Sequence, residues 1–292
     1  MVSDIISTGR PKPVPARPKD GQQRSAWQRW TIPGKPGSVW VSRYTLPVLS
    51  LAIFFTAWQI IGQRVDPILF TTPTKVARAL WTLITDGTLG PAFGTAMKDL
   101  GTGYLLAAVV GISVGILVGR SQVAERMLNP YINFFQATPL IALVPLVVIW
   151  FGVGFEARVV VVFILAVWSI IISTATGVKQ TPSSLLDVGR VYKYKRMQVV
   201  LGIELPNAVP SIFAGLRIAL GKALIGMVIA QMEISLTGLG GMVVNYGNAF
   251  KTAELLAVIV TASMVGVVAA ILLEVLRKWL FPWTEGGHDG RG

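Results

Sequence analysis

The sequence lacks cysteine and has a single histidine, His288, among its 292 residues. Disulfides, thiolate nucleophiles and the usual zinc sites are therefore excluded, and we expect no metal site in this chain. Charged residues are also scarce, at 14% against 53% hydrophobic residues. Soluble domains carry about 25% charged residues. With a mean hydropathy of +0.63, this composition indicates a polytopic membrane protein.

Six apolar runs are long enough to cross a hydrocarbon core, which takes about 20 helical residues. Because lipid offers no hydrogen-bond partners, each run must form a helix. We therefore predict an all-α polytopic membrane protein whose transmembrane domain covers residues 44–278, with six transmembrane helices at 44–61, 103–119, 131–151, 159–176, 212–232 and 255–273. The first run follows a long polar segment, so we expect it to be kept rather than cleaved as a signal peptide.

The distribution of lysine and arginine predicts the orientation. With six spans both ends lie on one side, and that side collects 18 of the 26 Lys and Arg residues against six on the other, with Arg217 and Lys222 inside a span. Positive residues concentrate on the cytoplasmic side. We predict a multi-pass protein of the plasma (inner) membrane with both termini in the cytoplasm.

The two ends of the chain are predicted to be tails. Residues 1–43 are rich in proline, glycine and basic residues and bury too little apolar surface to fold alone, so we expect a disordered basic cytoplasmic tail. Residues 279–292 form a second cytoplasmic tail. The first tail either sets the topology or binds anionic lipid or a partner. The net charge of +12 follows from the positive-inside bias, so nucleic acid is not an expected partner.

Small residues and prolines mark packing and bends within the spans. Gly111, Gly115 and Gly119 recur every four residues, which places them on one helix face and allows close approach of a neighbour. Pro139 and Pro145 interrupt the third run and each bends a helix. Such a bend either lines a pathway or is a tolerated kink.

Polar residues inside the spans are candidates for a translocation pathway. Gln136 and Thr138 lie in the third run, and Gln231 lies in the fifth. These groups tend to face a bundle interior, although interhelical hydrogen bonding explains them equally well. Arg217 and Lys222, also in the fifth run, either snorkel toward the cytoplasm or attract an anionic solute.

A polar loop at residues 178–211 separates the fourth and fifth runs. Thr181 and Pro182 predict a helix start, with Thr181 as N-cap, over "SSLLDVGRVY". The segment "KRMQVVLGIEL" predicts a second helix that Pro206 ends.

The order of residues in this loop resembles the EAA loop, Glu-Ala-Ala-x3-Gly-x9-Ile-x-Leu-Pro, of permease subunits of binding-protein-dependent ABC importers. The matching positions are Asp187, Val188, Gly189, Lys193, Ile203, Leu205 and Pro206. The segments "TPTKVARALWTL", "PLIALVPLVVIWFGVGFEAR", "VPSIFAGLRIAL" and "TGLGGMV" extend the resemblance, which is greatest to the sulfonate, taurine and nitrate branch.

Four positions depart from the pattern, and two of them are Val188 and Gly189 in place of alanine, of which Gly189 is a small-for-small exchange that still allows close packing. Asp187 stands where the family has Glu, and Lys193 replaces the turn glycine. If the turn needs a positive φ, a non-glycine residue costs about 1 kcal/mol. Either the turn has shifted or the strain is tolerated.

The resemblance implies partners for the chain. The loop is expected to form a coupling helix in a groove of a cytoplasmic ABC ATPase dimer, which Gly189 would enter because it is small. The chain has no G-x-x-x-x-G-K-[ST] phosphate loop, so it is not an ATPase; ATP and Mg²⁺ would bind the partner. The other implied partners are an extracytoplasmic solute-binding protein, membrane lipid and a second permease copy in a homodimer.

The resemblance also implies a function, import of a small anionic solute across the plasma membrane of a prokaryote. Gly238, Gly240 and Gly241 are similar to the family's extracytoplasmic loop after the fifth span, which is either a flexible gate or a plain connecting turn. A secondary transporter would need an inverted repeat and a carboxylate within the membrane, but Glu233 and Glu254 lie at span ends. A membrane-embedded enzyme would need a clustered catalytic site inside a span, which the sequence also lacks.

Overall fold

A computed structural model of the chain describes residues 39–66 and 68–281, and all regular structure in that part of the chain is helical. The predicted tails fall outside it, except for residues 39–43 and 279–281. The elements are α1 (Val39–Arg64), α2 (Pro73–Thr85), α3 (Leu89–Arg120), α4 (Gln122–Ala137), η3 (Leu140–Leu143), α5 (Val144–Phe151), α6 (Phe155–Lys179), α7 (Ser183–Val191), α8 (Arg196–Val199), η4 (Val200–Glu204), α9 (Leu205–Ala230), η5 (Gln231–Ser235), α10 (Gly238–Asn248) and α11 (Thr252–Leu280).

The chain divides into two compact units, residues 1–56 and residues 57–292. In the first unit, α1 begins at Val39, earlier than the predicted start at residue 44, and its apolar side chains from Leu46 to Phe55 are exposed, as expected of a helix that faces lipid. The second unit contains the last turns of α1 and all the other helices.

Helices α3 and α6 run side by side in the same direction. Four glycines of α3 face α6 at points where an added Cβ atom would lie 2.5 to 2.7 Å from a side-chain atom. Each contact lies 59 positions after its glycine: Val162 for Gly103, Ile170 for Gly111, Thr174 for Gly115 and Val178 for Gly119. A constant separation requires parallel helices. The predicted close approach at three of these glycines is confirmed.

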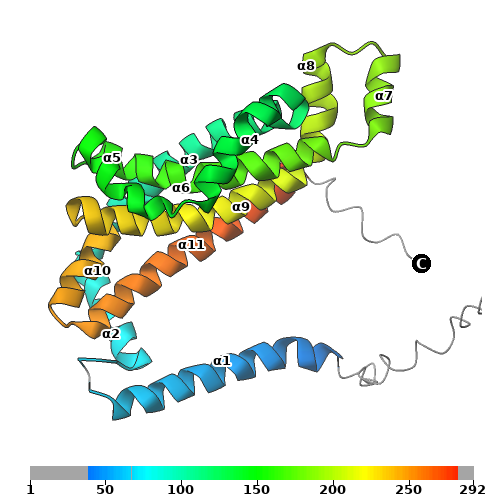
Figure 1. The fold of residues 1–292 in the computed structure, drawn as a ribbon. Helices are drawn as coiled ribbons and strands as arrows, with labels where there is room; N and C mark the ends of the chain where they lie inside the picture. Colours follow the sequence, from blue (N-terminus) through cyan, green and yellow to red (C-terminus); the bar gives the residue numbers. More distant parts are fainter. Residues whose placement is uncertain (1–38, 67, 282–292) are drawn as a thin grey trace, which may run out of the picture. The chain divides into compact units, whose positions relative to one another are not determined.

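Helix α9 packs on α6 in the opposite direction. Gly177 faces Ser211, Gly215 faces Ser173 and Gly226 faces Val162, so the two residue numbers of each pair add up to 388, as antiparallel helices require. The hydroxyl of Tyr104 in α3 also donates to the carbonyl oxygen of Leu216 in α9, at 2.8 Å. Helices α3, α6 and α9 therefore form the closely packed centre of the second unit (Figure 1).

The predicted third span, residues 131–151, is not one straight helix. Helix α4 ends at Ala137, before Pro139, and the segment from Leu140 to Phe151 is bent from it by 94°. At one end Lys179 Nζ, at the end of α6, lies 2.5 Å from Glu125 Oε1 near the start of α4. At the other end Val144 and Val147 of α5 belong to the same apolar cluster as Ala157, near the start of α6.

The bent segment therefore crosses the layer of helices once. Because α3 and α6 are parallel, the chain must return over the full length of α3 before α6 begins. From Asp99 to Gly119 that length is about 30 Å at 1.5 Å per residue, which matches the hydrocarbon core. Counting this crossing with the five long apolar helices gives six in the described part of the chain, and the predicted all-α membrane fold is confirmed.

The prediction that Pro206 ends a helix is wrong. Helix continues without interruption from Arg196 to Ser235, through Pro206 and Pro210. Just before Pro206 the chain forms a π turn, Val200–Glu204, in which the amide of Leu205 donates to the carbonyl oxygen of Val200. A π turn is wider than an α turn, and it accommodates the proline ring that would otherwise clash with the preceding carbonyl.

The short helices lie at opposite ends of the central helices. Helices α7 and α8 form a hairpin at the end where α6 stops, and α10 lies at the end where α9 stops (Figure 1). Phe281, just past α11, contacts Phe213 near the start of α9, with ring centroids 5.8 Å apart, so α11 finishes at the hairpin end. We call these two sides of the unit the hairpin end and the α10 end.

Candidate functional site

The hairpin at residues 181–204 has an inner face that depends on Gly189. Gly189 is buried, and a Cβ atom there would lie 3.0 Å from Cδ1 of Ile203 and 3.5 Å from Cγ2 of Val199. Gly189 and Ile203, which the sequence singled out separately, thus meet inside the hairpin. Because it has no side chain, Gly189 permits α7 to pack on η4. The expectation that Gly189 enters a groove of the ATPase is corrected, because the residue faces Ile203 and Val199 inside the hairpin.

The turn after α7 keeps a left-handed backbone in spite of its lysine. Lys193 has φ of 51°. Its amide donates to the carbonyl oxygen of Arg190 at 3.0 Å, and the amide of Tyr194 donates to that of Gly189 at 2.9 Å. This pair of bonds is a Schellman motif, whose left-handed position favours glycine. The turn has not shifted, and lysine at this position costs about 1 kcal/mol.

The outer face of α7 is apolar and exposed. Leu185, Val188, Val191 and Tyr192 are exposed by 42%, 48%, 77% and 70%. They recur at intervals of three or four residues and share a side of the helix. Asp187 and Arg190 are exposed beside them and pair with each other, with Arg190 Nη1 and Asp187 Oδ1 2.8 Å apart. An apolar stripe on an otherwise polar hairpin is the kind of surface that a partner protein covers.

Polar contacts fix the base of the hairpin to the central helices. Arg120 at the end of α3 pairs with Glu204 of η4, with Nε and Oε2 2.8 Å apart. Thr181 is not the N-cap of α7, as the sequence predicted; Pro182 holds that position, and Thr181 instead accepts a hydrogen bond from Asn207 of α9. Leu205 and Pro206 lie at the start of α9, with Leu205 against the main core. A force on the hairpin therefore reaches α3 and α9 directly.

The structure brings two of the five candidate pathway residues together. Lys222 Nζ of α9 lies 3.4 Å from Oε1 of Gln136, one residue before α4 ends. Thr138 follows at the bend, where its hydroxyl donates to the carbonyl oxygen of Phe134. Arg217 is exposed on α9 nearer the hairpin end. Gln231 lies apart from these four, fully buried at the end of α9.

The three glycines after α9 lie in the first turn of α10, where the connection from η5 is tightly packed. Gly238 has φ of +62°, and a Cβ atom there would lie 2.5 Å from Oε1 of Gln231. At Gly240 and Gly241 it would lie 2.4 and 2.1 Å from the carbonyl oxygens of Val228 and Leu236. The glycines are required for close packing, since any side chain would overlap its neighbours.

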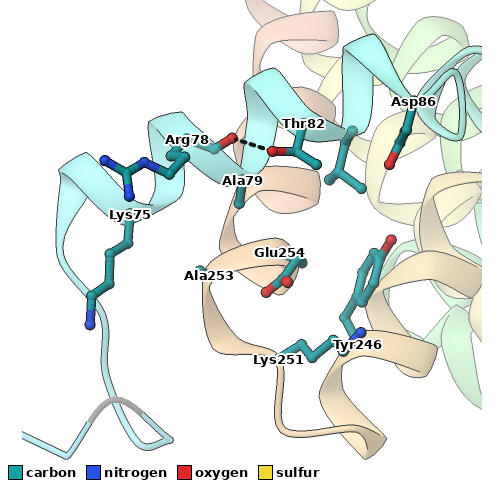
Figure 2. Close-up of a pocket in the computed structure, with 10 residues that line it drawn as sticks. Lys75, Arg78, Ala79, Thr82, Asp86, Tyr246, Lys251, Ala253 and Glu254 are labelled. Atoms are coloured by element: carbon teal, nitrogen blue, oxygen red, sulfur yellow. Dashed lines mark hydrogen bonds between the residues drawn. The ribbon is translucent and has the colours of Figure 1, made fainter.

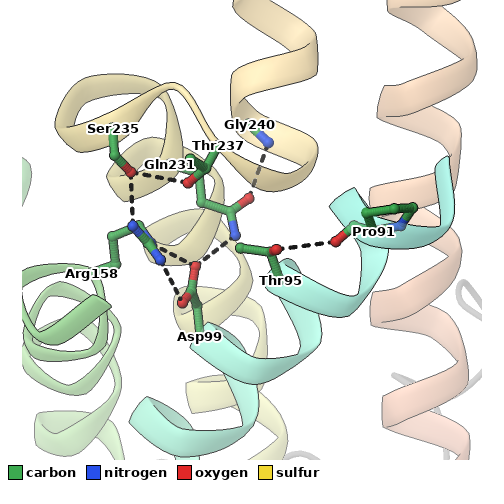
Figure 3. A network of polar contacts seen from close by, with 8 residues as sticks. All are labelled: Pro91, Thr95, Asp99, Arg158, Gln231, Ser235, Thr237 and Gly240. Atoms are coloured by element: carbon green, nitrogen blue, oxygen red, sulfur yellow. Dashed lines mark hydrogen bonds and ion pairs between the residues drawn. The ribbon is translucent and has the colours of Figure 1, made fainter. Parts of the chain in front are cut away.

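Sequence reasoning missed two buried charged residues beside this turn. Asp99 of α3 is 0% exposed and Arg158 of α6 is 8% exposed, with Arg158 Nε 2.8 Å from Asp99 Oδ2 (Figure 3). Both lie just before predicted spans, at 103–119 and 159–176, so the sequence places them in loops. Because α3 starts at Leu89 and α6 at Phe155, both residues are in helices. The spacing of 59 positions that relates the glycines to their partners also relates Asp99 to Arg158.

A second polar region lies between α2, α10 and α11. A cavity of about 450 Å³ is lined by the basic residues Lys75, Arg78 and Lys251 and by the carboxylates of Asp86 and Glu254 (Figure 2). Burial raises the pKa of the Tyr246 phenol in its wall, the two carboxylates raise it further, and a hydrogen bond with Thr88 opposes them. Tyr246 is therefore neutral at pH 7. These charged groups indicate that the α10 end is in water.

A layer of long apolar helices with a polar hairpin at one end and a charged cavity at the other defines a multi-pass membrane protein. The family model of the "binding-protein-dependent transport system inner membrane component" matches residues 107–286, more than half of the chain. The chain belongs to this family. It is therefore a permease subunit of an ABC importer in the inner membrane, and ATP hydrolysis takes place on a partner chain.

Named relatives match nearly the full chain. The putative aliphatic sulfonates transport permease protein SsuC of Bacillus subtilis (strain 168) is 29% identical over 87% of this chain and 91% of its own. The nitrate import permease protein NrtB of Synechococcus elongatus (strain ATCC 33912 / PCC 7942 / FACHB-805) is 30% identical over 91% of this chain and 96% of its own. The taurine transport system permease protein TauC of Escherichia coli (strain K12) is 29% identical over 82% and 90%.

Among solved structures, the fold is similar to a chain of the MetNI methionine ABC transporter. The TM-score is 0.51 at 19% identity, and the alignment covers 64% of this chain and 93% of the other. At this identity the likeness establishes the fold.

Proposed function

We propose that this permease imports a small anionic solute, of the sulfonate, taurine, nitrate or bicarbonate kind, delivered by an extracytoplasmic solute-binding protein. The relatives named above are permeases for aliphatic sulfonates, nitrate and taurine by their names, and the bicarbonate transport system permease protein CmpB of Synechococcus elongatus (strain ATCC 33912 / PCC 7942 / FACHB-805) is 31% identical over 82% of this chain. The single observation that carries the proposal is the contact of Lys222 with Gln136, because it places a cation and an amide beside the bend between α4 and α5. Together they offer an anion a charge and hydrogen-bond donors.

The surroundings of Lys222 support a pathway between two permease copies. Ile218, Gly221 and Ile225 are exposed on the same side of α9, and a Cβ atom on Gly221 would meet nothing within 4 Å. A lysine on such a face is costly in lipid, and charged residues in membranes face other protein or water. We infer a homodimer in which this face of α9 lines the space between the copies.

The same proposal orients the protein. The hairpin end carries Arg120 and Lys179 at the ends of α3 and α6, Arg196 at the start of α8 and Arg277 in the last turn of α11. This concentration of positive charge supports a cytoplasmic hairpin and cytoplasmic termini. The hairpin then meets an ATPase dimer that binds ATP and Mg²⁺, and the α10 end meets the binding protein.

One set of single-cysteine variants tests dimer and orientation together, because the chain has no cysteine of its own. In intact cells, a membrane-impermeant maleimide should label Thr88→Cys and spare Ser183→Cys. Ile225→Cys should form a disulfide-linked dimer on oxidation, whereas Val109→Cys, which is 66% exposed on α3, should not. Labelling of Ser183→Cys in intact cells argues against the orientation, and a monomeric Ile225→Cys argues against the interface.

Replacing Lys222 with Met should reduce solute uptake about 10- to 100-fold, because a hydrogen bond to a charged group contributes about 1.5–3 kcal/mol. Uptake of radiolabelled sulfonate, taurine, nitrate and bicarbonate would be measured in vesicles that hold the complete importer. Lys222→Arg should retain most of the uptake, and Arg126→Met, which removes an exposed cation near the start of α4, should leave it unchanged. If Lys222→Met takes up all four solutes at the full rate, Lys222 is not part of an anion site and that part of the proposal is wrong.

A further inference from the structure

A network of buried polar groups joins three helices to the turn after α9. Arg158 donates to both carboxylate oxygens of Asp99, at 2.8 and 3.3 Å, and to Oγ of Ser235 at 2.8 Å. Gln231 Nε2 donates to Asp99 Oδ2 at 2.8 Å, and its Oε1 accepts from the amide of Gly240 at 3.1 Å. Figure 3 shows these bonds converging from α3, α6 and the end of α9.

This network is more than a stabilising contact. A buried ion pair gives little net stability over well-packed apolar residues, because both charges lose their water. Here each charged group is satisfied. Two of the network's bonds go to Ser235, the last residue of η5, and to the amide of Gly240 in the first turn of α10, so they hold both ends of the connection between these helices. The arrangement fixes where the turn lies relative to α3 and α6.

The turn from Ser235 to Gly241 needs outside support to keep its shape. Leu236 has φ of 48°, which is unfavourable for a leucine, and Gly238 has φ of 62°. Non-glycine residues remain in left-handed conformations only where the surroundings impose them. The side chain of Gln231 is the contact that both Gly238 and Gly240 pack against.

The opposite side of the same turn borders a cavity. A space of about 480 Å³ is lined by Thr88, just before α3, by Thr95 of α3, by Thr237 and Gly238 of the turn and by Asn245 of α10. Pro91, Ala92, Leu236 and Met242 also line it, so the wall offers both hydrogen-bonding and apolar groups to a small solute. The turn therefore lies between the buried network and a cavity of mixed lining at the α10 end, and a shift of the turn changes the cavity.

We propose that Asp99, Arg158 and Gln231 are positioning residues that hold the Ser235–Gly241 turn as a movable wall of this cavity. The proposal rests on the function proposed above, in which the α10 end receives solute. The turn keeps its place while the network is intact. ATP binding to the partner moves the hairpin, and the movement reaches the turn because Gln231 and Ser235 belong to the same continuous helix as the hairpin base. Loss of the Gln231 bonds should disconnect the turn from that helix.

The experiment uses the complete importer in vesicles, with the permease carrying Leu236→Cys as a reporter on the turn. Leu236 is 52% exposed, and the chain has no other cysteine to react. The rate of reaction with a small polar maleimide is measured without nucleotide and after trapping with ATP and vanadate. We expect the two rates to differ about tenfold in the reporter alone, which is a typical coupling between distant sites.

Adding Gln231→Leu should leave assembly with the ATPase intact and make the two labelling rates equal. Ser235→Ala, which removes the hydrogen bonds of the Ser235 hydroxyl to Arg158 and to Thr237, should reduce the difference part of the way. Thr95→Val is the matched control, because its hydroxyl lines the same cavity but bonds to Pro91 in its own helix. It should keep the full difference.

Each result has a defined meaning. If the labelling rate of Leu236→Cys still depends on nucleotide in Gln231→Leu, the positioning role is overturned. If Gln231→Leu does not assemble with the ATPase, the same result in Ser235→Ala overturns it. Loss of dependence in Thr95→Val as well overturns it too, since any change at the cavity would then act alike. If the reporter alone never responds to ATP and vanadate while the importer still takes up solute, the turn does not move and the inference fails. If the importer takes up none of the solutes, the proposed function fails, and the inference fails with it.

Discussion

Replacing Val188 with Glu should separate the permease from its ATPase. Val188 is 48% exposed on the outer face of α7, so the variant should fold and insert normally. In a complex that covers this face, the new carboxylate would be buried without a partner, at about 3–5 kcal/mol. Binding should weaken by more than about 100-fold. The measurement is the amount of ATPase that co-purifies with the tagged permease at equal membrane levels.

Ser183→Glu provides the matched control for this charge. Ser183 is exposed in the first turn of α7, about 140° around the helix from Val188 at 100° per residue. An acidic residue there favours the helix dipole, so ATPase recovery should stay near that of the unmodified chain. Equal recovery for both variants would mean that the apolar stripe is not the docking surface. Gly189→Arg is a poorer test, because it would displace α7 from Ile203 whether or not a partner is bound.

Replacing Gly115 with Val should prevent stable folding. An added Cβ atom at this position would lie 2.5 Å from Cβ of Thr174 and 2.9 Å from the carbonyl oxygen of Ile171. Neither atom can move aside without moving α6, because the Ile171 oxygen is part of its backbone and the Thr174 Cβ is bonded directly to that backbone. We expect a loss of at least about 3 kcal/mol, the upper end for overpacking. Thermal stability in detergent, followed by size-exclusion chromatography, gives the measure.

Gly101→Val makes the same chemical change in the same helix. A Cβ atom at Gly101 would meet nothing within 4 Å, and valine is at least as favourable as glycine within a helix. This variant should keep the unmodified melting temperature within a few degrees. If Gly115→Val is equally stable, α3 and α6 do not touch at these glycines and the parallel arrangement is wrong.

The sequence predicted features that depend on local pattern. Apolar runs predicted the all-α membrane fold, and the four-residue spacing of Gly111, Gly115 and Gly119 predicted a close helix contact. The order of residues around Gly189 predicted the family. Each of these predictions depends on residues that are close together in the sequence: the residues of one helix, or the motif of one loop.

Features that depend on contacts distant in sequence were missed. Asp99 and Arg158 were not selected as site residues, because only the parallel packing of α3 on α6 brings these charges together. Pro206 predicted a helix end because nothing local indicates the π turn that accommodates its ring. The sequence predicted that Gly189 enters a groove of the ATPase, because nothing in the loop itself indicates which side of α7 faces Ile203.

The continuous helix from Arg196 to Ser235 has a mechanical consequence. Its 40 residues make a rod about 60 Å long, stiffened in the middle by its contact with α6. Its two π turns lie near its ends, Val200–Glu204 beside the hairpin and Gln231–Ser235 beside the buried network. Single π turns inside α-helices are rare and frequently occur at functional sites. In the mechanism proposed above, this single helix is the lever that passes a displacement of the hairpin to the Ser235–Gly241 turn, and the two π turns mark the points where its ends meet the hairpin and the network.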